Sequence, residues 1–209
     1  MMNGQLIPKG RRFKSGRGDT FYSNTNMKTE QICKNCRKDV HCCIFKDSDG
    51  FTFVGINDAK RIKKTIEKDY KEFLDYSPLS KKTIKELKED DPLVEGGMRC
   101  AQLDKDRILR LKTKKDKRCI FLNDGGNCDI YSVRPNICRI YPYWAIKLDN
   151  KQLKVIPHDN PSRCMIVKKK NVDKKEIIKL FKEVEKETAY YHKNIKEFVK
   201  KENIASKNR

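Results

Sequence analysis

The amino-acid sequence predicts a small, irregular α+β fold in which short hairpins are covered by helices, including a long C-terminal helix. Apolar and charged residues each make up 37% of the 209 residues, so the apolar core should be small for the length of the chain. Nine cysteines at short, clustered spacings offer a second source of order, a core organised by metal. Short apolar runs broken by turn residues precede a stretch with a helical apolar period.

Helices are predicted before and after this middle region. Asn57 or Asp58 can cap a helix that runs to about Tyr76, and Ser80 starts a short second helix. A long helix should cover residues 173–202. We expect its narrow apolar seam to pack on the cysteine-containing core, with helix-mediated self-association as the alternative. The seam consists of Ile177, Phe181, Val184, Thr188, Tyr191, Ile195 and Phe198.

The middle region should form short strands joined by tight turns. Asp124-Gly125-Gly126 and Asp149-Asn150 are typical of hairpin turns. Strands are predicted at 108–111, 119–122, 143–148 and 153–156, where short apolar runs stand between turn residues.

The chain divides into three segments by composition. Residues 1–28 are basic and poor in apolar residues, which predicts a disordered leader. Residues 29–167 hold all nine cysteines and should form the metal-binding domain, and residues 168–209 hold the amphipathic helix and a tail. No secretory signal is apparent, and no apolar run approaches the roughly 20 residues of a membrane span. We therefore expect a cytoplasmic protein that does not enter the membrane.

The net charge of +20 is spread along the chain, with +5 in residues 1–28, +8 in residues 29–167 and +7 in residues 168–209. A basic surface suits RNA or DNA, so a zinc-containing nucleic-acid-binding module is one interpretation. A surface rich in lysine and glutamate explains the same charge without a partner. Aromatic residues do not interleave the basic ones, which favours the second interpretation.

The cysteines favour metal over disulfides. Their number is odd and no secretory signal precedes them, so we expect free thiols in a reducing compartment. Cys33 and Cys36 form a C-x-x-C pair, the spacing with which two thiolates hold one metal from a tight turn. Cys42 and Cys43 follow directly on each other. Side chains of adjacent residues point to opposite sides of an extended chain, so these two should not serve one mononuclear site together.

The later cysteines carry a more specific pattern. Cys119-Ile-Phe-Leu is followed by Cys128-Asp-Ile-Tyr-Ser-Val-Arg-Pro-Asn-Ile-Cys138-Arg-Ile-Tyr-Pro. With the C-x-x-C pair and the C-C pair upstream, this pattern resembles the CxxCxxCC cysteine-cluster family over roughly residues 33–164. The resemblance implies a domain that chelates zinc or iron. Five residues separate Cys36 from Cys42, more than the family name implies, so the ligand loop should have a different shape here.

A related pattern occurs in flagellin lysine N-methylase-like proteins, and that resemblance implies a link to lysine N-methylation. No glycine-rich G-x-G loop follows a strand to hold a methyl donor, and no metalloprotease, serine hydrolase or P-loop signature occurs. An enzymatic role therefore stays open. Tyr131, Arg134 and Tyr141 of the family pattern should pack around the cluster loop rather than take part in catalysis.

Eight of the nine cysteines are predicted metal ligands, and Cys100 is left out because it lies outside the family pattern. Four sulfurs suit zinc and an iron–sulfur cluster equally, so the ligand type does not choose between these two metals. His41 and His158 are additional candidates, less favoured than the thiols. The eight predicted ligands are Cys33, Cys36, Cys42, Cys43, Cys119, Cys128, Cys138 and Cys164.

Arginines gather beside the cysteines. Five of the thirteen arginines adjoin a cysteine, where chance would place about one. A guanidinium next to a thiolate lowers the pKa of the thiol and offsets the negative charge of the ligands. We therefore expect charge compensation by Arg37, Arg99, Arg118, Arg139 and Arg163.

Overall fold

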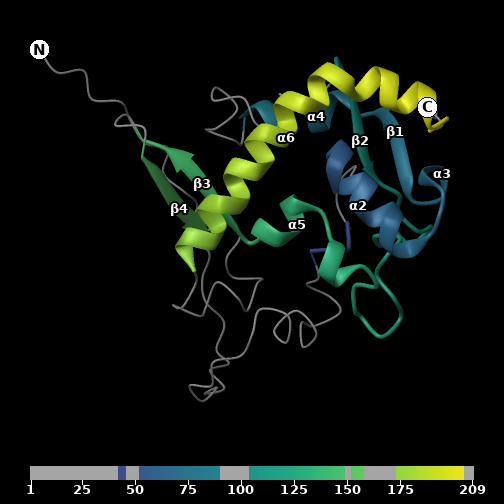
Figure 1. The fold of residues 1–209 in the computed structure, drawn as a ribbon, viewed down its shortest axis with the longest axis horizontal. Helices are drawn as coiled ribbons and strands as arrows, with labels where there is room; N and C mark the ends of the chain where they lie inside the picture. The colour runs from purple at the N-terminus through teal and green to yellow at the C-terminus, as the bar shows by residue number, and fades with distance from the viewer. Residues whose placement is uncertain (1–41, 46–51, 90–103, 149–151, 158–172, 205–209) are drawn as a thin grey trace, which may run out of the picture.

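The computed structural model describes residues 42–45, 52–89, 104–148, 152–157 and 173–204. Helices and two separate two-stranded antiparallel sheets make up an α+β fold, as predicted (Figure 1). In chain order the elements are α2 (Ile56–Ile66), α3 (Tyr70–Phe73), β1 (Leu74–Pro78), α4 (Lys81–Glu89), β2 (Arg107–Leu111), the 3-10 helix η3 (Tyr131–Val133), α5 (Asn136–Ile140), β3 (Tyr143–Lys147), β4 (Leu153–Pro157) and α6 (Lys174–Lys201).

The long helix α6 runs across the whole described fold, with the β3–β4 hairpin near its N-terminal end and α2, β1 and β2 near its C-terminal end (Figure 1). Asp173 caps it, because its side chain accepts hydrogen bonds from the N–H groups of Lys175 and Glu176. All seven residues of the predicted seam are buried. They pack against elements of the same chain, as expected.

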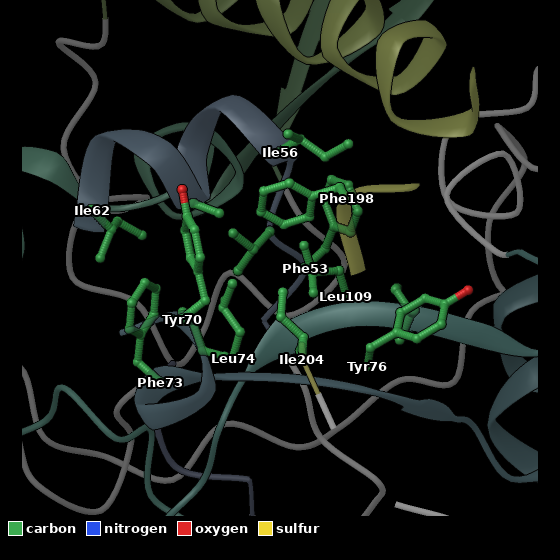
Figure 2. Packing of buried hydrophobic residues seen from close by; sticks show 14 of the residues in the cluster. Phe53, Ile56, Ile62, Tyr70, Phe73, Leu74, Tyr76, Leu109, Phe198 and Ile204 are labelled. Atoms are coloured by element: carbon green, nitrogen blue, oxygen red, sulfur yellow. The ribbon is translucent and has the colours of Figure 1, made fainter. Parts of the chain in front are cut away.

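The larger of two apolar cores lies at the C-terminal half of α6. Figure 2 shows side chains from α2, α3, β1 and β2 meeting Phe198 of α6 in this core. Tyr70 stands edge-on to Phe198, with ring centroids 5.2 Å apart, and Phe53 stands edge-on to Tyr191 at 5.3 Å. Edge-to-face contacts of this kind add to the stability that burial alone supplies.

The smaller core lies under the N-terminal half of α6. Ile177, Leu180, Phe181 and Val184 cover Ile140 of α5 and the β3–β4 hairpin there. The strands pair as predicted, with Ala145 opposite Val155 in the centre of the hairpin. The N-terminal half of α6 therefore packs against α5, and its C-terminal half packs against α2. Metal as an organiser of the core stays a prediction, because both of these cores are apolar.

The first helix is shorter than the sequence predicts. The structure ends α2 at Ile66, where Glu67 adopts a left-handed backbone with φ of 54°. Asp69 and Glu72 then form a capping box that begins the separate helix α3. Residues 74–78 leave the helix altogether, because they pair with β2 from Leu74 opposite Leu111 to Pro78 opposite Arg107. The stretch that was predicted as one helix therefore forms two short helices, α2 and α3, and the beginning of strand β1.

The predicted strand at 119–122 is also wrong. Cys119 makes one isolated bridge to Thr113, and Leu122 closes a turn by donating its N–H to the carbonyl of Cys119 at 3.0 Å. The predicted turn at 124–126 is confirmed, since the N–H of Gly126 donates to the carbonyl of Asn123 at 3.0 Å. Gly126 has φ of 79°, a conformation that suits glycine. The predicted turn at 149–150 and the predicted leader at 1–28 lie outside the described residues.

Substitution of Tyr191 by phenylalanine should lower the free energy of unfolding by about 1–3 kcal/mol, because a buried N–H group loses its acceptor. The Tyr191 hydroxyl accepts a hydrogen bond from the N–H of Leu109 at 2.9 Å inside the larger core. The matched control is Tyr190→Phe on the same helix, since Tyr190 is 40% exposed. Urea unfolding of both variants measures the difference, and equal stability would remove the special role of the Tyr191 hydroxyl.

Candidate metal centre

Five of the eight predicted ligands lie in the described part of the chain, and all five are free thiols. They come from a turn before the first helix, from the loop after β2 and from α5. These thiols are Cys42, Cys43, Cys119, Cys128 and Cys138. The other predicted ligands, Cys33, Cys36 and Cys164, lie outside the described residues, as do Cys100, His41 and His158.

Backbone pairing brings the first two of these segments together. The N–H of Cys119 donates to the carbonyl of Cys43 at 2.8 Å, and Ile44 makes an antiparallel bridge to Arg118. Further along the loop, the turn at 123–127 returns the chain so that Cys128 pairs with Leu122. These isolated bridges fix the backbone of Cys43 beside that of Cys119, although the two are far apart in sequence, and hold Cys128 beside Leu122 in the same loop.

The R-P-x-x-C motif places the fifth thiol. The N–H of Tyr131 donates to the carbonyl of Cys128 at 3.2 Å and begins η3 directly after that cysteine. Pro135 then stands at the N-cap of α5, and its carbonyl accepts the N–H of Cys138 at 2.9 Å. Proline suits a helix start because its fixed φ is already helical and it has no N–H to satisfy. One turn of helix thus carries Cys138 back toward the other thiols.

A buried carboxylate on α2 holds the start of α5. Asp58 is 3% exposed and accepts a hydrogen bond from the N–H of Asn136 at 3.1 Å. Its other oxygen lies 2.6 Å from Nη2 of Arg61, and the same Nη2 donates to the carbonyl of Arg134 at 3.0 Å. Asp58 and Arg61 together clamp the backbone of the R-P-x-x-C motif. The sequence predicted Asp58 as a candidate helix cap and gave Arg61 no role.

Cys42 and Cys43 lie together, not on opposite sides of the chain. Their backbone forms a turn, and their Sγ atoms are 4.0 Å apart. The expectation that adjacent cysteines should not serve one mononuclear site together assumed an extended chain, and the turn removes that assumption. Both thiols are therefore placed to face one site.

The five thiols lie within electrostatic reach of one another. The hydrogen bond with Cys43, together with the charge of Arg134 and against the effect of burial, lowers the pKa of Cys42 to about 7. The same hydrogen bond, together with burial, raises the pKa of Cys43. Burial raises the pKa of Cys119 to about 11, and the charge of Cys42 adds to this rise. Cys42 is therefore the thiol that ionises first.

Burial also raises the pKa of Cys128 and Cys138, and again the charge of Cys42 contributes in both cases. Burial therefore disfavours the thiolate form of these groups unless a cation lies beside them. A bound metal ion would supply such a cation, and its binding would release protons from the remaining thiols. The donor chemistry of this cluster fits a soft metal such as zinc or iron.

Among the described arginines, the one that offsets charge on the thiols is Arg134, which was not among the five predicted; the predicted Arg118 and Arg139 have other partners. Arg134 lowers the pKa of Cys42, Cys128 and Cys138, although it adjoins none of them in sequence. Arg118 instead forms ion pairs with Asp116 and Asp124. The sequence predicted that Arg134 packs around the cluster loop and did not assign it to charge compensation. The predicted Arg37, Arg99 and Arg163 lie outside the described residues.

No group of three Cys, His, Asp or Glu side chains within the described ranges could hold a metal ion as these side chains stand. The five thiols are near one another but are not yet a closed set of ligands. A tetrahedral site takes four donors at about 2.3 Å from the metal. Closing it requires the thiols to draw together or donors to join from the rest of the chain. The C-x-x-C pair directly precedes Cys42 in sequence and carries the right chemistry.

A second buried carboxylate ties α6 to α2. Glu187 accepts hydrogen bonds from the backbone N–H of Asn57 at 2.9 Å and from its side-chain amide. It therefore caps α2 in place of the N-cap residue Gly55, which has no side chain. A Cβ atom on Gly55 would lie 2.3 Å from Cγ of Glu187, so only glycine leaves room for this cap. Sequence reasoning missed Glu187 because it lies beside the predicted apolar seam.

Replacement of Glu187 by glutamine should stabilise the protein increasingly as pH rises. Burial raises the pKa of Glu187 above its usual 4.5, the Asn57 hydrogen bonds lower it, and the charge of Asp58 raises it. The folded state therefore binds the Glu187 proton more tightly than the unfolded state does. This contribution to stability is complete below about pH 4.5 and is lost as pH rises through the folded-state pKa. Urea unfolding of both proteins at pH 4.5 and pH 7 checks this expectation, and a pH-independent difference would contradict it.

A family model for a "putative zinc- or iron-chelating domain", named CxxCxxCC, matches residues 32–203. This chain belongs to the CxxCxxCC family. The match extends from the C-x-x-C pair to the end of α6, so the family domain includes the long helix as well as the cysteines. No solved structure matches the chain. None of the helices in the described ranges is long and apolar enough to cross a membrane.

Proposed function

We propose that this CxxCxxCC domain binds zinc or an iron–sulfur cluster and that the metal has a structural or redox role. The proposed ligands are Cys33, Cys36, Cys42, Cys43, Cys119, Cys128, Cys138 and Cys164. One observation carries the proposal: five free thiols from three separate segments are brought near one another, with the N–H of Cys119 bonded to the carbonyl of Cys43. In keeping with this, the charge of Cys42 raises the pKa of the four other thiols. A cation beside such a group of free thiols would favour their thiolate form, which is the form that binds metal.

The protein supplies the support that a metal centre needs around its ligands. Backbone hydrogen bonds fix the turn at Cys43 to Cys119, and Asp58 fixes the helix that carries Cys138. Outer groups that orient the ligands typically matter almost as much as the ligands themselves. Bound zinc would cross-link the three segments, and a bound iron–sulfur cluster would add the capacity to exchange an electron.

Anaerobic purification followed by an absorption spectrum and metal analysis tests the proposal. A brown protein with bands in the visible range identifies an iron–sulfur cluster, and a colourless protein with stoichiometric zinc identifies a structural zinc site. Structural metal binding is coupled to folding, so removal of the metal by a chelator should lower the melting temperature. A protein that is purified without either metal, and is fully folded in that state, would overturn the proposal.

A further inference from the structure

A pocket of about 380 Å³ opens directly beside the candidate metal centre. It has a strongly polar lining that includes one of the proposed ligands. The lining residues are Cys128, Asp129, Tyr131, Ser132, Arg134 and Arg139. They all belong to the segment from Cys128 to Cys138 or follow it directly, so the R-P-x-x-C motif builds the pocket as well as the ligand loop.

Arg134 presents free hydrogen-bond donors to this pocket. Its guanidinium carbon lies 4.0 Å from the centroid of the Tyr131 ring, a stacking contact that fixes the plane of the group. Among the described residues no acceptor forms a hydrogen bond with that guanidinium, although it carries five N–H donors. The hydrogen bond that the described part of the chain gives Arg134 is made by its backbone carbonyl, which accepts from Arg61. A half-buried guanidinium of this kind is prepared for an external acceptor.

Arg139 provides a second guanidinium at the same pocket. Its Nη1 donates to Oδ1 of Asn136 at 3.3 Å, which orients the group and leaves its other donors free within the described part of the chain. Asn136 is in turn held by Asp58 through its backbone. Both arginines are therefore positioned by the elements that position Cys138.

The charges on the pocket wall favour an anion. Arg134 and Arg139 contribute two positive charges, and Asp129 contributes one negative charge. The Asp129 carboxylate already accepts a hydrogen bond from the Asn123 amide at 2.8 Å. Ser132 is exposed and adds a hydroxyl donor to the wall. Two guanidinium groups and a hydroxyl are a donor set for the oxygens of a carboxylate or a phosphate.

We propose that this pocket binds the oxyanion group of a small molecule, a carboxylate or a phosphate, next to the metal centre. A role as a substrate or ligand site beside a metal rests on the proposed function. Binding of the anion depends on Arg134 and Arg139 and not on the metal. The Cys128 thiol forms part of the wall, so a bound anion lies against a ligand of the centre.

Isothermal titration calorimetry of the full-length, anaerobically purified protein tests the proposal, with inorganic phosphate and malonate as separate probes. The salt concentration should be about 150 mM, which screens the general attraction of a basic protein for anions. The test variant is Arg139→Gln, and Arg139→Lys keeps the charge but loses the planar fork. The matched control is Arg107→Gln, because the Arg107 guanidinium also stacks on a tyrosine, at 6.0 Å from the Tyr76 ring, but does not line the pocket.

We expect one equivalent of phosphate or malonate to bind, and the probe that binds more tightly identifies the ligand class. Arg139→Gln should weaken this binding at least about tenfold, which corresponds to loss of a single charge-assisted contact. Arg107→Gln should leave the affinity unchanged. Absence of binding up to about 10 mM of both probes, or equal weakening by the two glutamine variants, would overturn the inference.

Metal analysis of the same samples keeps the two proposals apart. A wild-type protein with stoichiometric metal but without anion binding overturns the pocket alone. A wild-type protein without metal overturns the proposed function, and the effects of Arg139→Gln and Arg107→Gln on the anion affinity still decide whether the pocket is real. Circular dichroism of each variant establishes that a loss of affinity does not come from unfolding.

Discussion

Replacement of Cys128 by serine is expected to remove most of the bound metal and to lower the melting temperature by about 6 °C or more. A structural zinc site contributes on the order of 10 kcal/mol to the folding of small domains, so loss of one of its thiolates should cost at least about 3 kcal/mol. For a chain of this size each kcal/mol corresponds to about 2–4 °C. Metal analysis and a thermal melt measure the two effects.

Cys128 is the best of the five described thiols for this test. It is half-buried, whereas Cys119 is buried, so serine at 128 disturbs apolar packing less. The matched control is Cys100→Ser, the same chemical change at the cysteine that the family pattern leaves out. We expect the control to keep both the metal content and the melting temperature of the wild type.

Melting both proteins again in the presence of a chelator separates lost metal from lost packing. If the effect of Cys128→Ser comes through the metal, chelator-treated wild type and chelator-treated variant should melt at similar temperatures. A difference that persists without metal would assign the effect to packing. Full metal content in Cys128→Ser would exclude this thiol from the centre.

Long periodic elements and local motifs were accessible from the sequence. The seam of α6 stepped by four and three over the whole helix, and its residues are buried as predicted. The strands of the β3–β4 hairpin were predicted to within about one or two residues, a margin that is usual for element boundaries. These features depend on neighbours in sequence, which is why a sequence pattern can reveal them.

Structural features that depend on partners distant in sequence could not be predicted from the sequence. The helical apolar spacing that ends at Phe73 led us to extend the predicted helix to about Tyr76, yet residues 74–78 form a strand because β2 offers them five paired residues. Glu187 lies outside the seam by its spacing, yet it is buried because α2 lacks a side-chain cap of its own. Charge compensation followed the same rule, since the cation that acts on the thiols is Arg134 and not their sequence neighbour Arg118.

For the thiols, the sequence predicted which cysteines belong together but not the local structure that brings them together. The family pattern indicated which cysteines belong together, and the structure brings five of them within electrostatic reach. The turn at Cys42 and Cys43 was not foreseen, because nothing in two adjacent cysteines distinguishes a turn from a strand. The clamp formed by Asp58 and Arg61 was not foreseen either, because its target, Asn136, lies 78 residues away from Asp58.

Substitution of Asp58 by alanine should destabilise the protein and weaken its hold on metal without altering a single thiol. The variant leaves the N–H of Asn136 without its acceptor inside the fold and removes the 2.6 Å partner of Arg61. Breaking a buried ion pair costs about 3–5 kcal/mol when the remaining charge stays buried. The Arg61 side chain is 35% exposed, and water takes up part of its charge. We therefore expect a loss of about 2–3 kcal/mol.

The effect on metal follows from what Asp58 holds. Its carboxylate fixes the N–H of Asn136, two residues before Cys138, and its partner Arg61 fixes the carbonyl of Arg134. Loss of groups that orient metal ligands typically costs about 10–100-fold in metal affinity. Competition with a chromophoric chelator measures this affinity. Asp58→Asn keeps an oxygen for the Asn136 N–H but loses the charge, so it should lie between alanine and wild type.

The matched control is Asp124→Ala in the loop near Cys128. The Asp124 side chain is 93% exposed and contacts Arg118 across the surface at 3.2 Å, so its removal should change stability little. Metal affinity should then follow the wild type in the control and fall in Asp58→Ala. If Asp58→Ala unfolds more easily but competes for metal as well as wild type, Asp58 only stabilises the fold. If both quantities fall together and Asp58→Asn recovers part of each, the carboxylate positions the helix that carries Cys138.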